Sequence, residues 1–318
     1  MTVIQGAAHK DHSSTTQDLI GTTCLIVNPA AGRGGIRAAL PKVLAAFSAR
    51  GIEAAYETSG PGEEEDLAVR AIQNGVTTIV AVGSDGTCGR IANAILRSAT
   101  PCRLAVVPTG TGNDFAKTLG VSRYTPDQVA DLVVRGEATR IDVGVADGHY
   151  FLNSCGFGFD ASVLEASNRV HFLKGDAVYI YSALGKLFTY RGIEVSANGV
   201  PGVRRGRMLM VTVSNGRSLG GAFKIAPRAS VVDGWLDACF FSDSNVVERL
   251  RLFVGAMRGT HIGMRSVSVA SVQHLALTFA SSALMEMDGE LRKARSNTVD
   301  LTCVPRALSV VAAPGALV

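Results

Sequence analysis

Short apolar runs and amphipathic segments alternate along the first 140 residues of the chain. Runs that include β-branched valine and isoleucine are typical of buried strands, and the segments between them repeat apolar residues at helical spacing. A repeated strand–helix order predicts a parallel sheet with helices on both faces. The expected strands lie at residues 25–27, 53–58, 79–82 and 104–107.

Polar, glycine-rich loops follow three of these strands directly, at residues 28–35, 83–87 and 108–114. The carboxyl ends of parallel strands share one edge of a sheet, where α/β proteins bind ligands, so we expect the loops to lie together. An ordinary strand–helix turn remains the alternative for the 83–87 loop alone. Three such loops at one edge favour a phosphate site over plain turns.

The loop at residues 83–87 indicates what kind of phosphate ligand fits. A helix that begins directly after the loop would offer free backbone N–H groups to an anion. Asp85 adds a carboxylate to the same turn. Because two bare negative charges repel each other, we expect a cation or a hydrogen-bond donor to accompany the anion, and a nucleotide phosphate with Mg²⁺ satisfies this condition.

The pattern changes near residue 141, where a mostly antiparallel β domain is expected to begin. Alternating apolar and polar residues separated by Gly, Asn and Asp turns are typical of such a domain. One long helix is expected at about residues 161–190, and a shorter amphipathic helix at 246–257. The alternating runs lie at residues 208–213, 236–241 and 275–279.

We therefore expect two domains, which suits a length of 318 residues. The predicted divisions are a disordered tail at residues 1–21, an α/β domain at 22–140, a β domain at 141–305 and a tail at 306–318 that can return to the first domain.

Composition narrows the partners of the protein. Apolar residues make up 47% of the chain and charged residues 18%, so a sizeable core can form. A net charge of +4 suits an anionic substrate or an anionic membrane surface, but it is too weak to predict binding to nucleic acid.

The sequence also favours a cytoplasmic location, peripheral at the inner membrane face. The six cysteines form no CxxC pair, which indicates free thiols in a reducing compartment. The first 21 residues lack the apolar segment of a signal peptide. No apolar run approaches the roughly 20 residues that cross a bilayer.

Familiar nucleotide-binding motifs are absent from the chain. It has no G-x-x-x-x-G-K-[ST], no G-x-G-x-x-G between a strand and a helix, and no protein-kinase motif set. The motifs that remain are Asn28-Pro29 with Gly32, Gly-Ser-Asp-Gly-Thr at 83–87, Pro-Thr-Gly-Thr-Gly-Asn-Asp at 108–114, Gly220-Gly221 with Pro227 and Asp233-Gly234, and Asp288-Gly289-Glu290.

At these residues the chain resembles the diacylglycerol kinase catalytic-domain family of lipid kinases, which also includes sphingosine and ceramide kinases. The family pattern is NPxxG, GGDGT, PxGTxNDxA, then GG…P…DG and a late DGE, and the chain carries these motifs in the same order. The resemblance covers about residues 23–301 and is closest to bacterial members. It implies an N-terminal nucleotide-binding domain and a C-terminal β-sandwich, with ATP and an acceptor lipid meeting between them.

The resemblance also implies roles for individual residues. Asp288 would be the general base for the lipid hydroxyl, with Glu290 beside it and Asp85 completing the catalytic set. Asp233, with the carbonyl groups of Ser230 and Trp235, would hold a structural Mg²⁺. The residues expected around ATP are Asn28, Pro29, Gly32, Arg33, Thr58, Gly83, Ser84, Asp85, Gly86, Thr87, Gly110, Thr111, Gly112, Asn113 and Asp114.

The chain departs from the family pattern beside the central loop. Ser84 replaces the second glycine of GGDGT, and Gly89-Arg90 stands where the family usually has Asn-Glu. Ser84 places a Cβ where the backbone should approach phosphate. Arg90 has two interpretations, a contact with phosphate or a solvated position on the helix.

The motif Asp288-Gly289-Glu290 has two interpretations as well. Phosphoryl transfer needs positioning, charge neutralisation and a carboxylate that accepts a proton. Two carboxylates that flank a glycine can point the same way, and their repulsion would raise one pKa or recruit Mg²⁺. Taken alone, Asp-Gly-Glu predicts a hairpin turn. The order of the motifs favours the catalytic interpretation.

Two further segments could meet a membrane, although a plainer role is expected for each. Arg204, Arg205 and Arg207 form a basic cluster, which predicts a solvated loop or, alternatively, a contact with anionic lipid headgroups. Apolar residues on the helix at 246–257 predict core packing, with membrane contact as the alternative. That face holds Val246, Leu250, Phe253, Val254 and Met257, with Arg249, Arg251 and Arg258 opposite.

The sequence thus predicts a kinase that uses ATP and Mg²⁺ to phosphorylate a lipid hydroxyl, with diacylglycerol as the leading acceptor. One alternative is a NAD kinase, which shares a GGDGT-like loop but would carry an Asn-Glu pair that we do not find. Another is a regulator that binds lipid or nucleotide without turnover. A homodimer is plausible because exposed β edges are expected.

Overall fold

The computed structural model describes residues 22–60, 62–110, 112–167, 169–170, 176–198, 200 and 206–317. The expected tail at 1–21, Thr111 and the arginines at 204 and 205 lie outside these residues. The chain forms two compact units, the first up to Ile141 together with the chain from Arg306 onward, and the second Asp142–Pro305. Within the described residues, no helix is long and apolar enough to cross a membrane.

The N-terminal unit is built on a parallel sheet with the order β2-β1-β3-β4-β15, in which each strand runs parallel to its neighbours. Its central strands consist of buried apolar residues because helices cover both faces. The strands are β1 (Thr23–Val27), β2 (Ala55–Glu57), β3 (Thr78–Gly83), β4 (Arg103–Pro108) and the end of β15 (Thr298–Val310).

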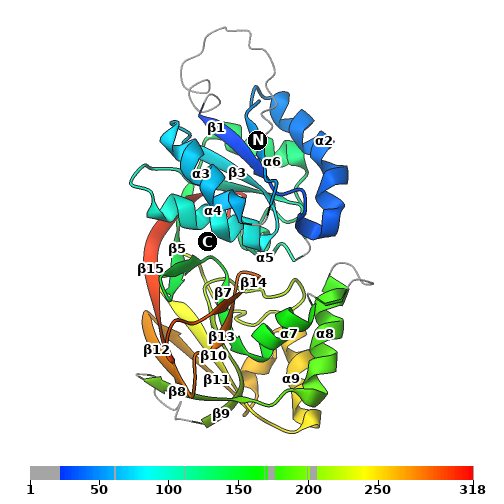
Figure 1. The fold of residues 1–318 in the computed structure, drawn as a ribbon, viewed down its shortest axis with the longest axis vertical. Helices are drawn as coiled ribbons and strands as arrows, with labels where there is room; N and C mark the ends of the chain where they lie inside the picture. The colour runs from blue at the N-terminus through cyan, green and yellow to red at the C-terminus, as the bar shows by residue number, and fades with distance from the viewer. Residues whose placement is uncertain are drawn as a thin grey trace. The chain divides into compact units, whose positions relative to one another are not determined.

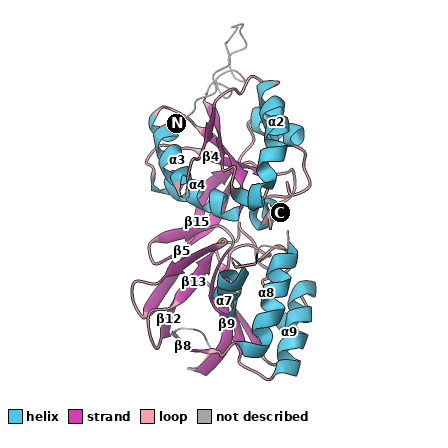
Figure 2. Ribbon diagram, turned by 45° about the vertical axis from the view of Figure 1, so that its right-hand side comes forward, coloured by secondary structure: helices cyan, strands magenta, loops and turns pink. Residues whose placement is uncertain are grey.

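Helices cover this sheet as the sequence pattern predicts. Helices α3 and α4 lie on one side of the sheet and α2 on the other (Figures 1 and 2). Local signals fix α6, whose N-terminus carries a capping box between Thr125 and Gln128 and whose end is marked by Gly136 in the left-handed conformation. The helices are η1 (Ala31–Gly34), α2 (Gly35–Ser48), α3 (Glu63–Gln73), α4 (Asp85–Arg97), α5 (Asp114–Thr118) and α6 (Pro126–Arg135).

The C-terminal unit is a mostly antiparallel β-sandwich, so the predicted fold class is confirmed for both parts of the chain. Its longest path of paired strands is β14-β13-β7-β9-β8-β12-β15, with β10 paired to β9 and β11. The strands are β5 (Thr139–Ala146), β6 (His149–Phe151), β7 (Ser154–Gly158), β8 (Ile193–Asn198), β9 (Gly206–Ser214), β10 (Leu236–Ser242), β11 (Val267–Val272), β12 (His274–Phe279), β13 (Leu284–Met287), β14 (Glu290–Lys293) and β15.

The two faces of β10 serve two different cores, as the period-two alternation of a strand requires. Ala238 and Phe240 point into the core between the sheets. Cys239 and Phe241 point into a second core, which the strand shares with three helices. These helices are α7 (Phe159–Ser167), α8 (Asp176–Thr189) and α9 (Val246–Arg258), while η2 (His261–Gly263) follows α9.

The single long helix expected at 161–190 is wrong, because the chain forms the separate helices α7 and α8. The hydroxyl of Ser167 donates to the carbonyl of Leu164 at 2.8 Å, and the next backbone N–H groups donate to the carbonyl groups three residues earlier. The N–H of Arg169 donates to Ala166, and that of Val170 to Ser167. Side-chain bonds of this kind compete with the helical backbone and favour its end.

All six cysteines are free and buried. Burial raises the pKa of the thiols of Cys24, Cys102 and Cys239 to about 12 each. Burial also raises the pKa of the Cys303 thiol, to about 11. A thiol with such a pKa is not a nucleophile at neutral pH, so these residues act as small apolar side chains.

Candidate functional site

The three glycine-rich loops of the N-terminal unit lie together at the carboxyl ends of β1, β3 and β4. A Cβ placed on Gly110 would lie 2.8 Å from the Cα of Ser84, and one on Gly32 would lie 3.0 Å from the carbonyl oxygen of Thr109. Gly32 also has a φ of +60°, which disfavours other residues. Glycine at 32 and 110 therefore lets the loops approach each other.

Asp85 joins two of these loops. It begins α4, and its Oδ1 accepts a hydrogen bond from the backbone N–H of Phe115 at 2.9 Å. The 108–114 loop is fixed further by Asn113, whose Oδ1 accepts from the N–H of Gly110 at 2.8 Å. Asp85 thus holds the central loop against α5.

Asn28 shapes the first loop through all of its polar atoms. Its Oδ1 accepts hydrogen bonds from the N–H groups of Ala30 and Ala31, at 3.0 and 3.1 Å. Its Nδ2 donates to Oε1 of Glu64 at 2.6 Å. These bonds close the turn after β1 and tie it to helix α3.

Glu64 is the centre of this network, and sequence reasoning missed its role. Its side chain is fully buried, and besides Asn28 it accepts from the hydroxyl of Thr87 at 3.4 Å and from Arg90 at 3.0 Å. From the sequence, Glu64 is only one of three glutamates in the first turn of a helix. No local pattern could show that its partner lies on α4.

The structure gives Arg90 a protein partner that neither interpretation named. Its side chain is 20% exposed and forms an ion pair with Glu64, so the solvated position is wrong. The residue that stands in place of the family's glutamate thus meets a carboxylate from another helix.

A polar cavity of about 770 Å³ opens beside this network. Arg37, Arg70 and Arg90 bring positive charge to its wall, and carboxylates lie there as well. The volume falls in the range of small-molecule sites, and the mixed charge suits an anion that carries a cation. The lining residues are Asn28, Pro29, Ala30, Ala31, Arg37, Glu57, Thr58, Ser59, Gly60, Glu63, Asp66, Leu67, Arg70, Ser84 and Arg90.

Most of the other predicted nucleotide residues belong to the same loops. Gly83 leaves no space for a Cβ, which would lie 2.4 Å from the hydroxyl oxygen of Thr87. Asp114 begins α5, where its carboxylate is largely buried and pairs with Lys117 at 2.9 Å. Gly86 lies in the first turn of α4 and Gly112 in the loop after β4, whereas Thr111 and the side chain of Arg33 lie outside the described part of the chain.

In the C-terminal unit, Asp288 occupies a hairpin turn, but its side chain is buried and not exposed to solvent. Asp288 and Gly289 connect β13 to β14 with φ values of +49° and +87°, as in tight two-residue hairpins. The carboxylate of Asp288 is nonetheless buried, and it accepts hydrogen bonds from the backbone N–H groups of Leu152, Asn153 and Ser154 at 2.6, 2.8 and 3.2 Å. Glu290 begins β14 and is half-buried.

The loop predicted to hold Mg²⁺ closes on its own backbone. Asp233 Oδ1 accepts from the N–H of Trp235 at 3.0 Å, and the hydroxyl oxygen of Ser230 accepts from Val232 at 3.4 Å. The N–H of Gly234 donates to Oδ2 of Asp142 at 2.6 Å. The side chain of Asp142 is fully buried, and the sequence did not predict its contact with this loop. Within the described residues, no three His, Cys, Asp or Glu side chains group to hold a metal ion.

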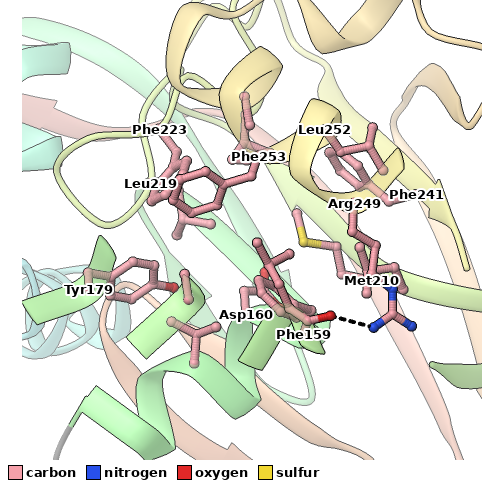
Figure 3. Close-up of a pocket in the computed structure, with 16 residues that line it drawn as sticks. Phe159, Asp160, Tyr179, Met210, Leu219, Phe223, Phe241, Arg249, Leu252 and Phe253 are labelled. Carbon is pink, nitrogen blue, oxygen red and sulfur yellow. Dashed lines mark hydrogen bonds between the residues drawn. The ribbon is translucent and has the colours of Figure 1, made fainter. Parts of the chain in front are cut away.

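An apolar cavity of about 50 Å³ lies between the sheet and the helices of the C-terminal unit (Figure 3). The carboxylic side chain of Asp160 and the guanidinium of Arg249 lie among its mostly apolar ones. Arg249 donates to the carbonyls of Leu187 and Tyr190 at 2.8 and 2.9 Å and pairs with Asp243 at 2.6 Å. Arg249 therefore holds the end of α8 rather than facing solvent.

Asp160 has only neutral hydrogen-bond donors among its recorded contacts. It accepts from the hydroxyl of Thr212 and from the N–H of Ala161, both at 2.9 Å. Burial raises the pKa of its carboxyl to about 7, although these hydrogen bonds act in the opposite direction. Gly156 is required beside it, since a Cβ there would lie 1.9 Å from Asp160 Oδ2.

Two protein-family models match the chain. The model of the diacylglycerol kinase catalytic domain matches residues 22–146, and that of the YegS C-terminal NAD kinase beta sandwich-like domain matches residues 153–312. The diacylglycerol kinase of Bacillus subtilis (strain 168) is 29% identical over 84% of this chain and 88% of its own length. That of Staphylococcus saprophyticus is 25% identical over the same shares of the two chains.

Solved structures share the fold. A crystal structure from Bacillus anthracis str. Sterne matches with a TM-score of 0.74 at 22% identity and covers 92% of this chain and 97% of its own. A second from the same organism, described as a diacylglycerol kinase, gives a TM-score of 0.69 at 21% identity over 93% and 98% of the two chains. From these matches and the motif order, the chain belongs to the diacylglycerol kinase catalytic-domain family of ATP-dependent lipid kinases.

Proposed function

We propose that this lipid kinase transfers the γ-phosphoryl group of ATP to the free hydroxyl of diacylglycerol, which yields phosphatidic acid. The observation that carries the nucleotide half of the proposal is the convergence of three glycine-rich loops beside a polar cavity of nucleotide size. The names of the relatives from B. subtilis and S. saprophyticus support the choice of acceptor.

In this proposal the N-terminal unit binds ATP. Backbone N–H groups at the start of α4 would meet the phosphates, in a site that forms because glycine at 32 and 110 lets the three loops approach one another. The ion pair with Glu64 fixes the Arg90 guanidinium at the cavity wall. Mg²⁺ would reach the site on the nucleotide, because this ion is commonly bound through phosphates, water and one or two carboxylates. Asp85 is the carboxylate that we propose for it, whereas Asp233 and the carbonyl groups of Ser230 and Trp235 are proposed for a separate, structural Mg²⁺.

Asp288 is proposed as the general base. The acceptor hydroxyl passes its proton to the Asp288 carboxylate while its oxygen bonds to the γ-phosphorus, and the bond from that phosphorus to the bridging oxygen breaks, which releases ADP. The three backbone N–H groups of residues 152–154 fix the orientation of this carboxylate before the acceptor arrives. Such preorganisation is what phosphoryl transfer requires of a protein.

The acceptor is tested with labelled ATP and a panel of diacylglycerol, sphingosine and NAD, the lipids in mixed micelles. We expect transfer to diacylglycerol above the other two. Preferred transfer to NAD would replace the proposal with the NAD kinase alternative, and no transfer to any acceptor would favour a regulator without turnover.

The role of Asp288 is tested by Asp288→Asn, which keeps the size of the side chain. We expect at least a hundredfold loss of transfer with ATP affinity largely unchanged, because loss of a general base typically costs 10² to 10⁴-fold. Asp300→Asn is the matched control, since Asp300 is exposed on β15 of the same unit. Transfer by Asp288→Asn at the wild-type rate would show that another group accepts the proton.

A further inference from the structure

Helices α8 and α9 each present an apolar face to the protein interior and a second apolar face to solvent. Their inner faces line the apolar cavity, through Tyr179, Ala183 and Leu187 of α8 and through Leu252, Phe253 and Ala256 of α9. The two helices pack side by side in the C-terminal unit (Figures 1 and 2). A surface helix ordinarily turns polar residues to solvent, so the second apolar face is unexpected.

The outer face consists of Tyr181, Leu184 and Phe188 of α8 with Val247, Leu250 and Val254 of α9. On each helix the three residues follow the spacing i, i+3, i+7, so they form one stripe. Tyr181 is 54% exposed, Phe188 61% and Val247 59%. We call these six residues the α8–α9 outer face.

Exposed apolar side chains are concentrated on these two helices. Twelve large apolar side chains are exposed in the described part of the chain, and seven of them lie on α8 and α9. These seven are the six residues of the outer face and Val246. Single exposed apolar residues need no explanation, but several that gather on two neighbouring helices indicate an interaction surface.

Cations predominate among the charged side chains described on these two helices. Arg251 and Arg258 are exposed on α9, and Lys186 is the charged side chain described on α8. The acidic residue of α9, Glu248, accepts from the hydroxyl of Ser266 at 2.8 Å and lies 3.6 Å from Arg251. Among the described side chains of both helices, no carboxylate is exposed, and apolar residues flanked by cations fit an anionic lipid surface.

We propose that the α8–α9 outer face is the surface through which this kinase docks on an anionic bilayer. Tyr181, Phe188 and their neighbours enter the headgroup boundary, while Arg251 and Arg258 meet anionic headgroups. The choice of a bilayer rests on the proposed function, because a lipid acceptor lies in the membrane and the inner faces of the same helices line the apolar cavity. Docking there brings the acyl chains next to that cavity.

The test measures sedimentation of the full chain with vesicles of phosphatidylcholine containing about a third phosphatidylglycerol. The variant Phe188→Glu/Val247→Glu introduces charge at exposed positions, where it leaves the core intact. We expect at least a tenfold loss of vesicle affinity, and a smaller loss for Arg251→Gln/Arg258→Gln that disappears with pure phosphatidylcholine or at high salt. The control is Val269→Glu, because Val269 is 45% exposed on β11 of the same unit.

Activity assays separate this proposal from the proposed function. With a short-chain diacylglycerol that is monomeric in water, Phe188→Glu/Val247→Glu should retain the wild-type kcat, whereas with diacylglycerol in vesicles its rate should fall at least tenfold. Vesicle binding can be measured even if diacylglycerol proves not to be the acceptor. The docking proposal is overturned if the variant binds vesicles within twofold of wild type. It is overturned equally if the substitution only converts a dimer into monomers in light scattering while vesicle affinity stays constant.

Discussion

The two units of the chain each bury a carboxylate beside a cavity, but only one of these carboxylates has a cationic partner among its recorded contacts. Glu64 in the N-terminal unit is held by an arginine, an amide and a hydroxyl. Asp160 in the C-terminal unit receives one hydroxyl and one backbone N–H, and burial raises its pKa to about 7. The polar cavity that we propose for the nucleotide lies beside a carboxylate whose charge is compensated, whereas the apolar cavity allows its carboxylate to become neutral.

The largest effect in this comparison of Glu64 with Asp160 is expected when the Glu64 carboxylate is removed. Glu64→Ala removes the carboxylate that pairs with the Arg90 guanidinium and leaves Asn28 Nδ2 with only its longer contact to the Thr87 hydroxyl, at 3.4 Å. Breaking a buried pair costs about 3–5 kcal/mol, and we expect the lower end because Arg90 is partly exposed. Urea unfolding measures this loss.

A double-mutant cycle of Glu64→Gln and Arg90→Gln tests whether the ion pair is responsible. We expect a coupling of about 1 kcal/mol or more, as for other contacting charged residues. A coupling near zero would mean that the network acts through Asn28 and Thr87 alone, and the contrast with Asp160 would lose its basis.

The variant Asp160→Asn tests the other carboxylate through the pH dependence of the free energy of unfolding. A folded pKa of about 7 lies above the ordinary value of 3.8, so the folded state binds more protons between these values. Stability of the wild type therefore falls as pH rises from about 4 to 7, by up to about 4 kcal/mol. Asn can still accept from Ala161 and donate to Thr212, so the variant should lose this dependence.

Thermal unfolding of both proteins at pH 5 and pH 8 measures the difference. Relative to wild type, Asp160→Asn should gain stability at pH 8. An equal difference between the two proteins at both pH values would show that Asp160 is not the titrating group.

The smallest change in the free energy of unfolding is expected for Glu65, the residue that follows Glu64. Glu65 pairs with Arg97 on the surface, where both side chains are more than a third exposed. Surface pairs contribute about 0–1 kcal/mol, so Glu65→Gln should change the unfolding free energy by less than about 0.5 kcal/mol. A loss like that of Glu64→Ala would show that burial is not what separates the two glutamates.

The sequence predicted the fold class because its signals are local. Apolar runs define the parallel strands, and the glycine loops that follow them must lie at one edge of the sheet. It could not predict the partner of Glu64, which is 26 residues away on another helix. Nor could it show that the Asp288 carboxylate turns inward, since the backbone of the turn is the same either way.

The sequence predicted the position of helix α9 but not which of its faces is buried. The predicted apolar face joined residues that the structure separates, because Phe253 lines the cavity while Leu250 and Val254 are exposed. Arg249, expected on the polar side, is buried against the end of α8. Apolar residues surround most of this helix, so periodicity alone cannot set its phase.

The burial of every native cysteine gives the protein a practical use. A thiol reagent at neutral pH should leave the natural side chains unmodified while the chain stays folded, so a single engineered cysteine can carry a fluorophore without prior removal of the others. Placed at Phe188→Cys, an environment-sensitive dye would report directly when that part of α8 leaves water.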